Sequence, residues 1–198
     1  MFKKNIPYVM LLILLICNIA RADEPDAAIH DELRGLLKQV ETAINTGKYD
    51  DMLPVLSENL RATPINQEFL TNRKEVSAYF NKWFGKEGYL KRLEIKFTPD
   101  ASTELSEDKT WGLVYGAGVE NYILSDSRKY ELHTRWTALA VKESDGKWRI
   151  RSIHIGTNFL DNPILSMVEN NAKYFAIVGV VVGLLLGLAL SWLIRRRK

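Results

Sequence analysis

The amino-acid sequence predicts an α+β domain, with N-terminal helices packed on a curled antiparallel sheet, followed by one C-terminal transmembrane helix. In the first part of the chain, apolar residues recur at the three- and four-residue spacing of helices. After Gly88 they alternate with polar residues, which is the period of strands with one buried face. Residues 174–194 carry no charge. Helices that precede a run of hairpin strands are typical of the α+β class.

Residues 1–22 are predicted to be a secretory signal peptide. Two lysines precede a short apolar run at residues 10–16, and Ala20 and Ala22 are small residues at the positions that a signal peptidase needs. We therefore expect cleavage after Ala22, with Asp23 as the first residue of the mature chain.

Two alternatives stay open for this segment. It could remain as an uncleaved N-terminal anchor, although its apolar run is shorter than a bilayer span. Cys17 could be a lipoprotein site, although such sites want a small residue in place of Ile16. Cys17 is the only cysteine in the chain, so cleavage would exclude disulfides, cysteine nucleophiles and cysteine-ligated metals from the mature protein.

Residues 174–194 are predicted to span a membrane. These 21 residues would form a helix about 31 Å long, at ~1.5 Å per residue, which matches the hydrocarbon core of a bilayer. Tyr174 and Trp192 stand near its ends, where amphipathic rings favour the interface. The basic tail at residues 195–198 is expected in the cytoplasm. The domain is then expected in the periplasm or outside the cell, anchored to the inner (cytoplasmic) membrane.

The charge balance excludes one class of partner. The chain has 27 Lys and Arg residues and 24 Asp and Glu residues. The basic excess lies in the signal peptide and the tail, because residues 23–173 hold four more acidic than basic residues. The exported part therefore has no basic excess, and the sequence predicts no nucleic-acid partner.

Three helices are predicted before the sheet. The first has the apolar stripe Ile29, Leu33, Leu37, Val40 and Ile44, and Gly47 suits its end. A short helix is expected at about residues 49–56. A third helix begins near Asn72, with Glu75 in its first turn and Gly85 after its last.

Four alternating strands follow the helices. The second of them is predicted to bury Trp111, Leu113, Tyr115, Ala117 and Val119. Asp145 and Gly146 form a hairpin signal before the last strand. Beyond the sheet, residues 161–173 are expected to form a juxtamembrane helix or linker, with Pro163 at a first helical position.

These elements resemble a known family. Segments 46–53 and 72–76 look like the nuclear-transport-factor-2-like superfamily, and the closing hairpin at 145–154 is similar to its SnoaL-like members. The resemblance covers about residues 27–160, within a domain at 23–160. It implies a strongly curved sheet wrapped around helices as a cone, with a cavity at the open end. Members include isomerases, dehydratases, cyclases and hydrolases, whereas others bind ligands or dimerise, so the fold does not settle the function.

His154 is the leading candidate for a functional side chain. It shares strand parity with Trp148 and Ile150, which predicts that it points toward the cavity, where it could act as a base or bind a ligand. The alternative is a hydrogen-bonded structural histidine. The same inward parity predicts a mostly apolar pocket lined by Tyr115, Asn121, Tyr130, Thr134, Trp136 and Ser152.

No carboxylate is expected inside the cavity. Strand parity turns Glu94, Glu120 and Glu131 outward, although a bulge at a strand glycine could bring Glu120 inward. His30 and His133 are isolated and expected to be exposed. The sequence has no metal-ligand spacing, phosphate loop, nucleophile elbow or dinucleotide fingerprint, so neither a metal nor a cofactor is predicted.

The sequence favours a membrane-anchored domain that binds a small apolar ligand or an envelope protein. The alternative function is an enzyme of isomerase, dehydratase or cyclase type that uses His154. A homodimer is also expected, because a small-residue stripe on the membrane helix would allow two helices to approach closely. That stripe consists of Gly179, Gly183, Gly187 and Ser191.

Overall fold

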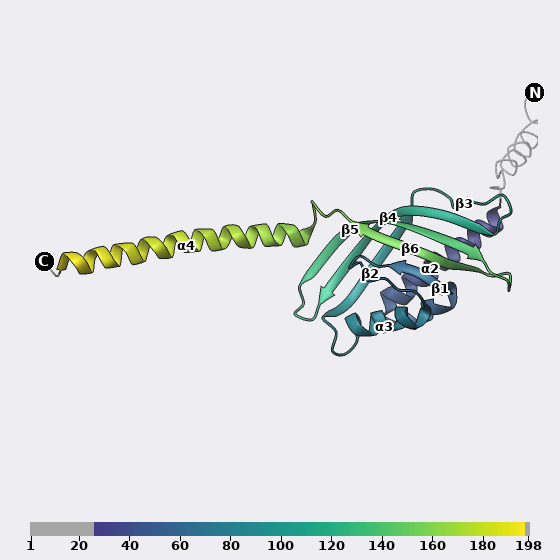
Figure 1. Ribbon diagram of the computed structural model, residues 1–198, viewed down its shortest axis with the longest axis horizontal. Coiled ribbons are helices and arrows are strands. Elements are labelled where there is room, and N and C mark those ends of the chain that lie inside the picture. The colour runs from purple at the N-terminus through teal and green to yellow at the C-terminus, as the bar shows by residue number, and fades with distance from the viewer. Residues whose placement is uncertain (1–25, 197–198) are drawn as a thin grey trace, which may run out of the picture.

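The computed structural model describes residues 26–196, so the predicted signal peptide lies outside the described residues. Figure 1 shows α2 and α3 on one face of a bent sheet, with α4 projecting away from the domain. The elements follow in this order: α2 (Ala27–Thr46), the 3-10 helix η1 (Tyr49–Val55), β1 (Leu56–Thr63), α3 (Arg73–Phe84), β2 (Leu90–Pro99), β3 (Glu104–Leu105), β4 (Trp111–Leu124), β5 (Lys129–Lys142), β6 (Trp148–Thr157) and α4 (Pro163–Arg196).

The predicted α+β class is confirmed, but the prediction that all the strands are antiparallel is wrong. The strand order is β1-β6-β5-β4-β2, with β3 paired to β4, and β1 runs parallel to β6. The sheet is therefore mixed. The sequence did not predict β1, because its buried residues do not alternate and its register with β6 shifts between Leu56 and Arg61. A parallel partner far away in the sequence leaves no local signal.

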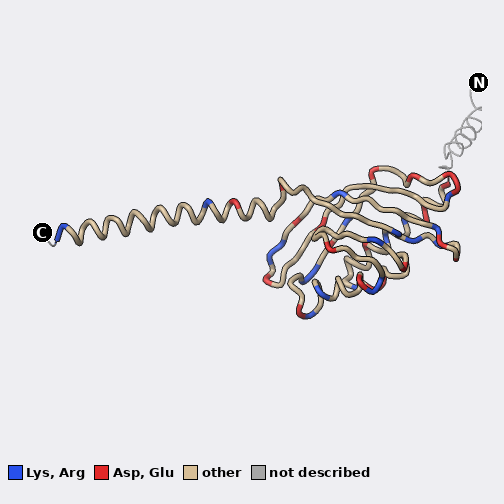
Figure 2. The backbone as a smooth tube through the Cα atoms, in the orientation of Figure 1, with Lys and Arg blue, Asp and Glu red and all other residues tan. Residues whose placement is uncertain are grey.

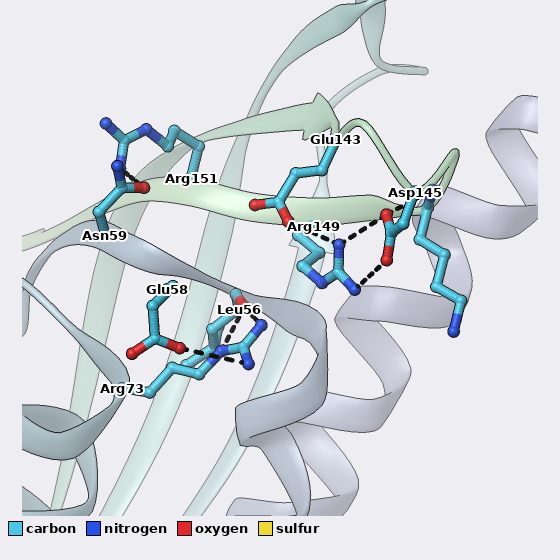
Figure 3. Close-up of polar contacts among 9 residues, drawn as sticks. Leu56, Glu58, Asn59, Arg73, Glu143, Asp145, Arg149 and Arg151 are labelled. Atoms are coloured by element: carbon cyan, nitrogen blue, oxygen red, sulfur yellow. Dashed lines mark hydrogen bonds and ion pairs between the residues drawn. The ribbon is translucent and has the colours of Figure 1, made fainter.

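Two arginines hold β1 through polar contacts (Figure 3). Arg73 on α3 donates to the carbonyl oxygen of Leu56 through Nε at 2.8 Å and Nη2 at 2.5 Å, which ties the helix to the start of β1. Arg151 on β6 donates to the side-chain oxygen of Asn59 on β1. The Arg151 contact thus reinforces the pairing of β1 with β6, where the backbone register is irregular.

The predicted hairpin between β5 and β6 is confirmed. Gly146 has a φ of 79°, in the left-handed region that glycine adopts without strain, and its N–H donates to the carbonyl of Glu143 at 2.8 Å. Arg149 then closes the hairpin, donating to Asp145 through both terminal nitrogens and to Glu143 at 2.6 Å (Figure 3). Arg149 is thus paired with two carboxylates.

Side chains of α2 form hydrogen bonds with the backbone of the edge strand β2. Asn45 accepts from the N–H of Ile95 at 2.6 Å and donates to its carbonyl at 2.9 Å. One turn earlier, Glu41 accepts from the N–H of Phe97 at 2.5 Å. These bonds satisfy backbone groups that an edge strand would leave unpaired, and they cover that part of the edge against another chain.

The side of β4 that faces the helices is opposite to the predicted one. Gly116 pairs with Trp136, and Gly118 pairs with Thr134, and both partners are 3% exposed. Directly paired residues share a face, so the even-numbered residues of β4 point inward. Tyr115, expected to be buried, is 39% exposed. The prediction was wrong because large apolar residues occupy the outer face of β4, whereas glycines occupy its inner face.

The inward glycines make room for rings from both neighbouring strands. Phe97 of β2 and Trp136 of β5 lie across β4, with ring centroids 5.6 Å apart. A Cβ atom on Gly116 would lie 2.7 Å from the Trp136 ring and 2.3 Å from the carbonyl oxygen of Thr98. Only a residue without a side chain allows this approach of backbone and rings.

α4 is one continuous helix of 34 residues, Pro163–Arg196, and it contains the whole predicted span. It is long and apolar enough to cross a membrane, and its most apolar stretch is not buried against the rest of the protein. Figure 2 shows a mostly uncharged helix with basic residues at its C-terminal end, which are Arg195 and Arg196.

Replacement of Gly116 by alanine should destabilise the domain. The new methyl group would overlap the backbone of β2 and the Trp136 ring, and overpacking of this kind typically costs about 1–3 kcal/mol. We expect the melting temperature of the full chain in detergent to fall by about 2–4 °C per kcal/mol. Gly156→Ala is the matched control, because open space surrounds that position on β6. Equal melting temperatures for the two variants would contradict this account of the interior.

Candidate functional site

The space between the helices and the sheet holds an apolar inner pocket of about 100 Å³. Its polar side chains are Glu120, Tyr79 and Tyr122, and the remainder of the lining is apolar. The apolar part of the lining is Val40, Ile44, Met52, Leu56, Leu60, Ala62, Pro64, Ile65, Leu70, Val76, Phe80, Leu93, Ile95, Phe97, Ile150, Ile153 and Ile155.

Glu120 lies at this pocket with 2% of its surface exposed, so its expected outward orientation is wrong. It sits on β4 between Ile95 of β2 and Leu132 of β5, both of which are buried. Tyr122 donates to Glu120 Oε2 at 2.5 Å, and Thr134 donates to Oε1 at 3.2 Å. No bulge is needed to bring Glu120 inward, because the register of the whole of β4 does so.

Burial raises the pKa of Glu120 above its ordinary value, although the hydrogen bonds from Tyr122 and Thr134 oppose this shift. Burial and the adjacent carboxyl group also raise the pKa of Tyr122, so this phenol keeps its proton and acts as a donor. The site therefore holds a carboxyl group that takes up a proton more readily than a carboxyl group in water. Such a group can donate to a ligand or exchange a proton with it.

A second pocket of about 280 Å³, here called the α2 pocket, adjoins the inner pocket. The two share Val40, Phe97, Ile150 and Ile153 in their linings. His30 also lines the α2 pocket and is 7% exposed, so its expected exposure is wrong. The reason is helical geometry, because a residue three positions before the buried Leu33 lies on the same face of α2.

A third pocket of about 260 Å³, here called the mouth pocket, lies where the strands meet the start of α4. It shares Ile65 and Tyr122 with the inner pocket. Its lining is Ile65, Tyr89, Leu90, Tyr122, Leu124, Arg128, Tyr130, Leu132, Ile164 and Met167. The inner pocket therefore has the α2 pocket and the mouth pocket as neighbours, and Glu120 belongs to its lining.

His154 does not reach any of these pockets, so its expected inward orientation is wrong. Its side chain is exposed, and it pairs with Thr137 on the outer face of β5. The physical cause is a bulge. Ala140 pairs with Ile150 while Leu139 pairs with Ser152, which leaves Arg151 as an extra residue on β6. Beyond that bulge the parity of β6 reverses, and Ile153 turns inward in place of His154.

The structure divides the other predicted pocket residues between the two faces of the sheet. Thr134 and Trp136 are buried inside, and Tyr130 lines the mouth pocket. The outer face carries the others, since Tyr115 pairs with Thr137, Asn121 with Glu131, and Ser152 with Leu139. His133, expected to be exposed, has 78% of its side-chain surface exposed. Among residues 26–196, no cluster of His, Cys, Asp or Glu could hold a metal ion.

Solved structures share this architecture. A candidate scytalone dehydratase from Novosphingobium aromaticivorans matches with a TM-score of 0.58 at 10% identity, over 68% of this chain and 87% of that one. A nuclear transport factor 2-like superfamily protein from Salmonella enterica matches with a TM-score of 0.55 at 12% identity, over 66% and 92% of the chains. The domain has the nuclear-transport-factor-2-like fold.

A third match to this fold is a candidate calcium/calmodulin-dependent protein kinase II association domain from Xanthomonas campestris. Its TM-score is 0.52 at 19% identity, over 65% of this chain and 86% of that one. No family model and no curated protein sequence matches the chain. The nuclear-transport-factor-2-like matches thus confirm the predicted resemblance at the level of fold, and at these identities they do not transfer a reaction.

Glu120 should make the stability of the domain depend on pH. Its pKa is raised in the folded state, so the folded chain binds its proton more tightly than the unfolded chain does. This contribution is fully present below the ordinary glutamate pKa of 4.5, and it is lost as the pH rises through the folded-state value. Glu120→Gln keeps the shape of the neutral acid without titrating.

We therefore expect the melting temperature of the wild type, relative to Glu120→Gln, to fall as the pH rises from below 4.5 toward neutrality. The control is Glu131→Gln on the exposed face of β5. A constant difference between wild type and Glu120→Gln across this range would show that the Glu120 carboxyl group is not perturbed.

Proposed function

We propose that this chain is a membrane-anchored protein whose exported domain binds a small, largely apolar ligand inside the cone. The observation that carries this proposal is the carboxyl group of Glu120, 2% exposed on an otherwise mostly apolar pocket. Ligand pockets typically combine an apolar lining with a few convergent polar groups that fix the orientation of the ligand. Glu120 and Tyr122 line the pocket here, and Thr134 holds Glu120 by a hydrogen bond.

The chemistry of the cluster indicates which end of a ligand it would hold. A neutral Glu120 can donate its own proton to a carbonyl or hydroxyl oxygen while it accepts from Tyr122 and Thr134. A ligand carboxylate would meet a second acid in a buried site, which costs free energy. The proposed ligand is therefore neutral at its polar end.

The membrane anchor in this proposal is α4, whose length and hydropathy suit a bilayer span. The expected signal peptide and the basic end of α4 both support an exported domain with a cytoplasmic C-terminus. In that arrangement the domain and its pockets lie close to the outer surface of the membrane that holds the helix.

A second candidate function is proton transfer on an apolar substrate. The predicted catalytic residue, His154, lies on the outer face of the sheet, and Glu120 takes its place as the candidate acid or base. The observation in favour is the raised pKa of the Glu120 carboxyl group beside a phenol donor. The binding function remains first, because one buried carboxyl group serves recognition without any further catalytic group.

Filling the inner pocket should remove a retained ligand. Ile153 lines both the inner pocket and the α2 pocket, whereas the next residue, His154, is exposed on the other face. We expect native mass spectrometry of the detergent-extracted chain to show a bound small molecule in the wild type and in His154→Trp, and none in Ile153→Trp. Melting temperatures establish that both variants fold. Retention of the ligand by a folded Ile153→Trp variant would place it elsewhere.

The proton-transfer candidate has a direct probe in 5-nitrobenzisoxazole, an apolar molecule whose ring opens when a base removes one proton. If Glu120 acts as a base inside the pocket, the wild type should accelerate this ring opening, and Glu120→Gln should abolish the acceleration. His154→Ala should leave it unchanged, because that side chain is outside the pocket. Acceleration that survives Glu120→Gln would exclude Glu120 as the base.

A further inference from the structure

We infer that the ligand enters the cone from the membrane, through the mouth pocket at the start of α4, and that it is a single-chain neutral lipid with one hydroxyl or carbonyl end. This inference rests on the proposed binding function. It adds a source, a route and a chemical class to that function.

The mouth pocket and the inner pocket adjoin at two side chains. Ile65, which follows β1, and Tyr122 on β4 line both of them. The hydroxyl of Tyr122 also donates to Glu120 at 2.5 Å. A molecule that passes from the mouth pocket into the inner pocket therefore meets Tyr122 first and the carboxyl group of Glu120 next.

The membrane helix itself builds one wall of the mouth pocket. Ile164 and Met167, in the first two turns of α4, belong to its lining. Tyr130 on β5 donates its hydroxyl hydrogen to the sulfur of Met167 at 3.0 Å, which fixes the helix against the strand ends. The helix is thus both the proposed anchor and part of the pocket, so the pocket opens on the side of the domain that faces the bilayer.

An apolar stripe on α4 connects this pocket to the proposed membrane span. Ile164, Val168, Ala172 and Phe175 follow one another at four- and three-residue spacing, so they lie on one face of the helix. The opposite face is polar, with Ser166, Asn170 and Lys173, and Asn171, seven residues after Ile164, borders the stripe. Ile164, Val168 and Phe175 are all exposed.

The distance along α4 from the mouth pocket to the proposed membrane span is short. Pro163–Arg196 begins 11 residues before the uncharged segment at 174, which is about 16 Å at ~1.5 Å per residue. The headgroup layer takes up roughly 5–8 Å of that distance. A lipid presents its polar end at the membrane surface, nearest to the domain. It can therefore enter polar end first while its chain follows the apolar stripe.

The pockets also limit the shape of this lipid. Each of the three is smaller than the roughly 300 Å³ typical of small-molecule sites, but together they fall within the usual range. Small pockets in series suit one narrow chain better than a bulky or two-chain molecule. The guanidinium of Arg128 at the mouth is already paired with Asp126 at 2.7 Å, so it offers no strong attraction to an anionic head.

The test measures how fast a membrane-borne probe reaches the inner pocket. The full chain is placed in phosphatidylcholine nanodiscs that contain hexadecanol with a photoreactive diazirine on its chain, and cross-links are mapped by mass spectrometry. Met167→Trp fills the mouth pocket, and Asn170→Trp adds the same ring to the exposed polar face. We expect Met167→Trp to slow the initial labelling about tenfold, equivalent to a barrier higher by ~1.4 kcal/mol. Asn170→Trp should label at the wild-type rate.

A second pair of variants tests the stripe without altering the pocket. Val168→Glu places a charge on the apolar face, and Asn170→Glu places the same charge on the polar face. Only the first should slow labelling. Occupancy after long incubation should be equal in the wild type, Asn170→Trp and the two glutamate variants, because a route affects the rate and not the equilibrium, whereas Met167→Trp also removes part of the space for the lipid chain.

The outcomes separate this inference from the function on which it rests. Wild-type rates in both Met167→Trp and Val168→Glu, with the inner pocket still labelled, would overturn the route from the membrane. Absence of labelling in the wild type at long times would overturn the lipid class. In the mass spectrometry experiment above, a folded Ile153→Trp variant that still retains the ligand would overturn the proposed binding function itself.

Discussion

The interior of this domain depends on two positions without side chains on the inner face of β4. At Gly116 and Gly118 the strand has no Cβ atom, and the rings of Phe97 and Trp136 approach from the two neighbouring strands to fill that space. The glycines thereby fix which face of β4 turns inward. The next inward position after them is Glu120, so the same constraint that shapes the core also brings a carboxyl group into it. Packing and site chemistry thus have one cause, which is the register of a single strand.

A buried carboxyl group is unfavourable for stability unless it is hydrogen-bonded or neutral. Glu120 has the hydrogen-bond donors Tyr122 and Thr134 beside it, and its pKa, raised by burial, favours the neutral form. A core designed only for stability would place an apolar residue between Ile95 and Leu132, where Glu120 stands. The presence of an acid in that row is the physical reason to propose a site. A binding role and a proton-transfer role use the same group and differ only in whether the proton leaves it.

The arrangement of the pockets relates that site to α4, the candidate membrane span. The inner pocket meets the mouth pocket at Ile65 and Tyr122, and α4 supplies Ile164 and Met167 to the mouth. The contact of Tyr130 with Met167 orients the helix relative to the sheet. A helix that lines a pocket couples its own position to access to that pocket. This coupling gives the proposed binding function a direction and a source for the ligand.

The sequence by itself determined the elements whose signals are local. The helical stripe from Leu33 to Ile44, the helix start at Asn72, the hairpin at Gly146 and the uncharged segment within α4 each depend on neighbours a few residues away, and the nuclear-transport-factor-2-like fold could be predicted from their order. The tertiary structure alone decided the features that depend on a partner strand. It placed β1 parallel to β6, turned the even residues of β4 inward and inserted the bulge at Arg151 that moves His154 to the outer face. The side chains of a strand alternate between its two faces, so one extra residue in a bulge exchanges the faces for all the residues beyond it. Alternation in the sequence identifies two sets of residues, and only packing decides which set is the interior.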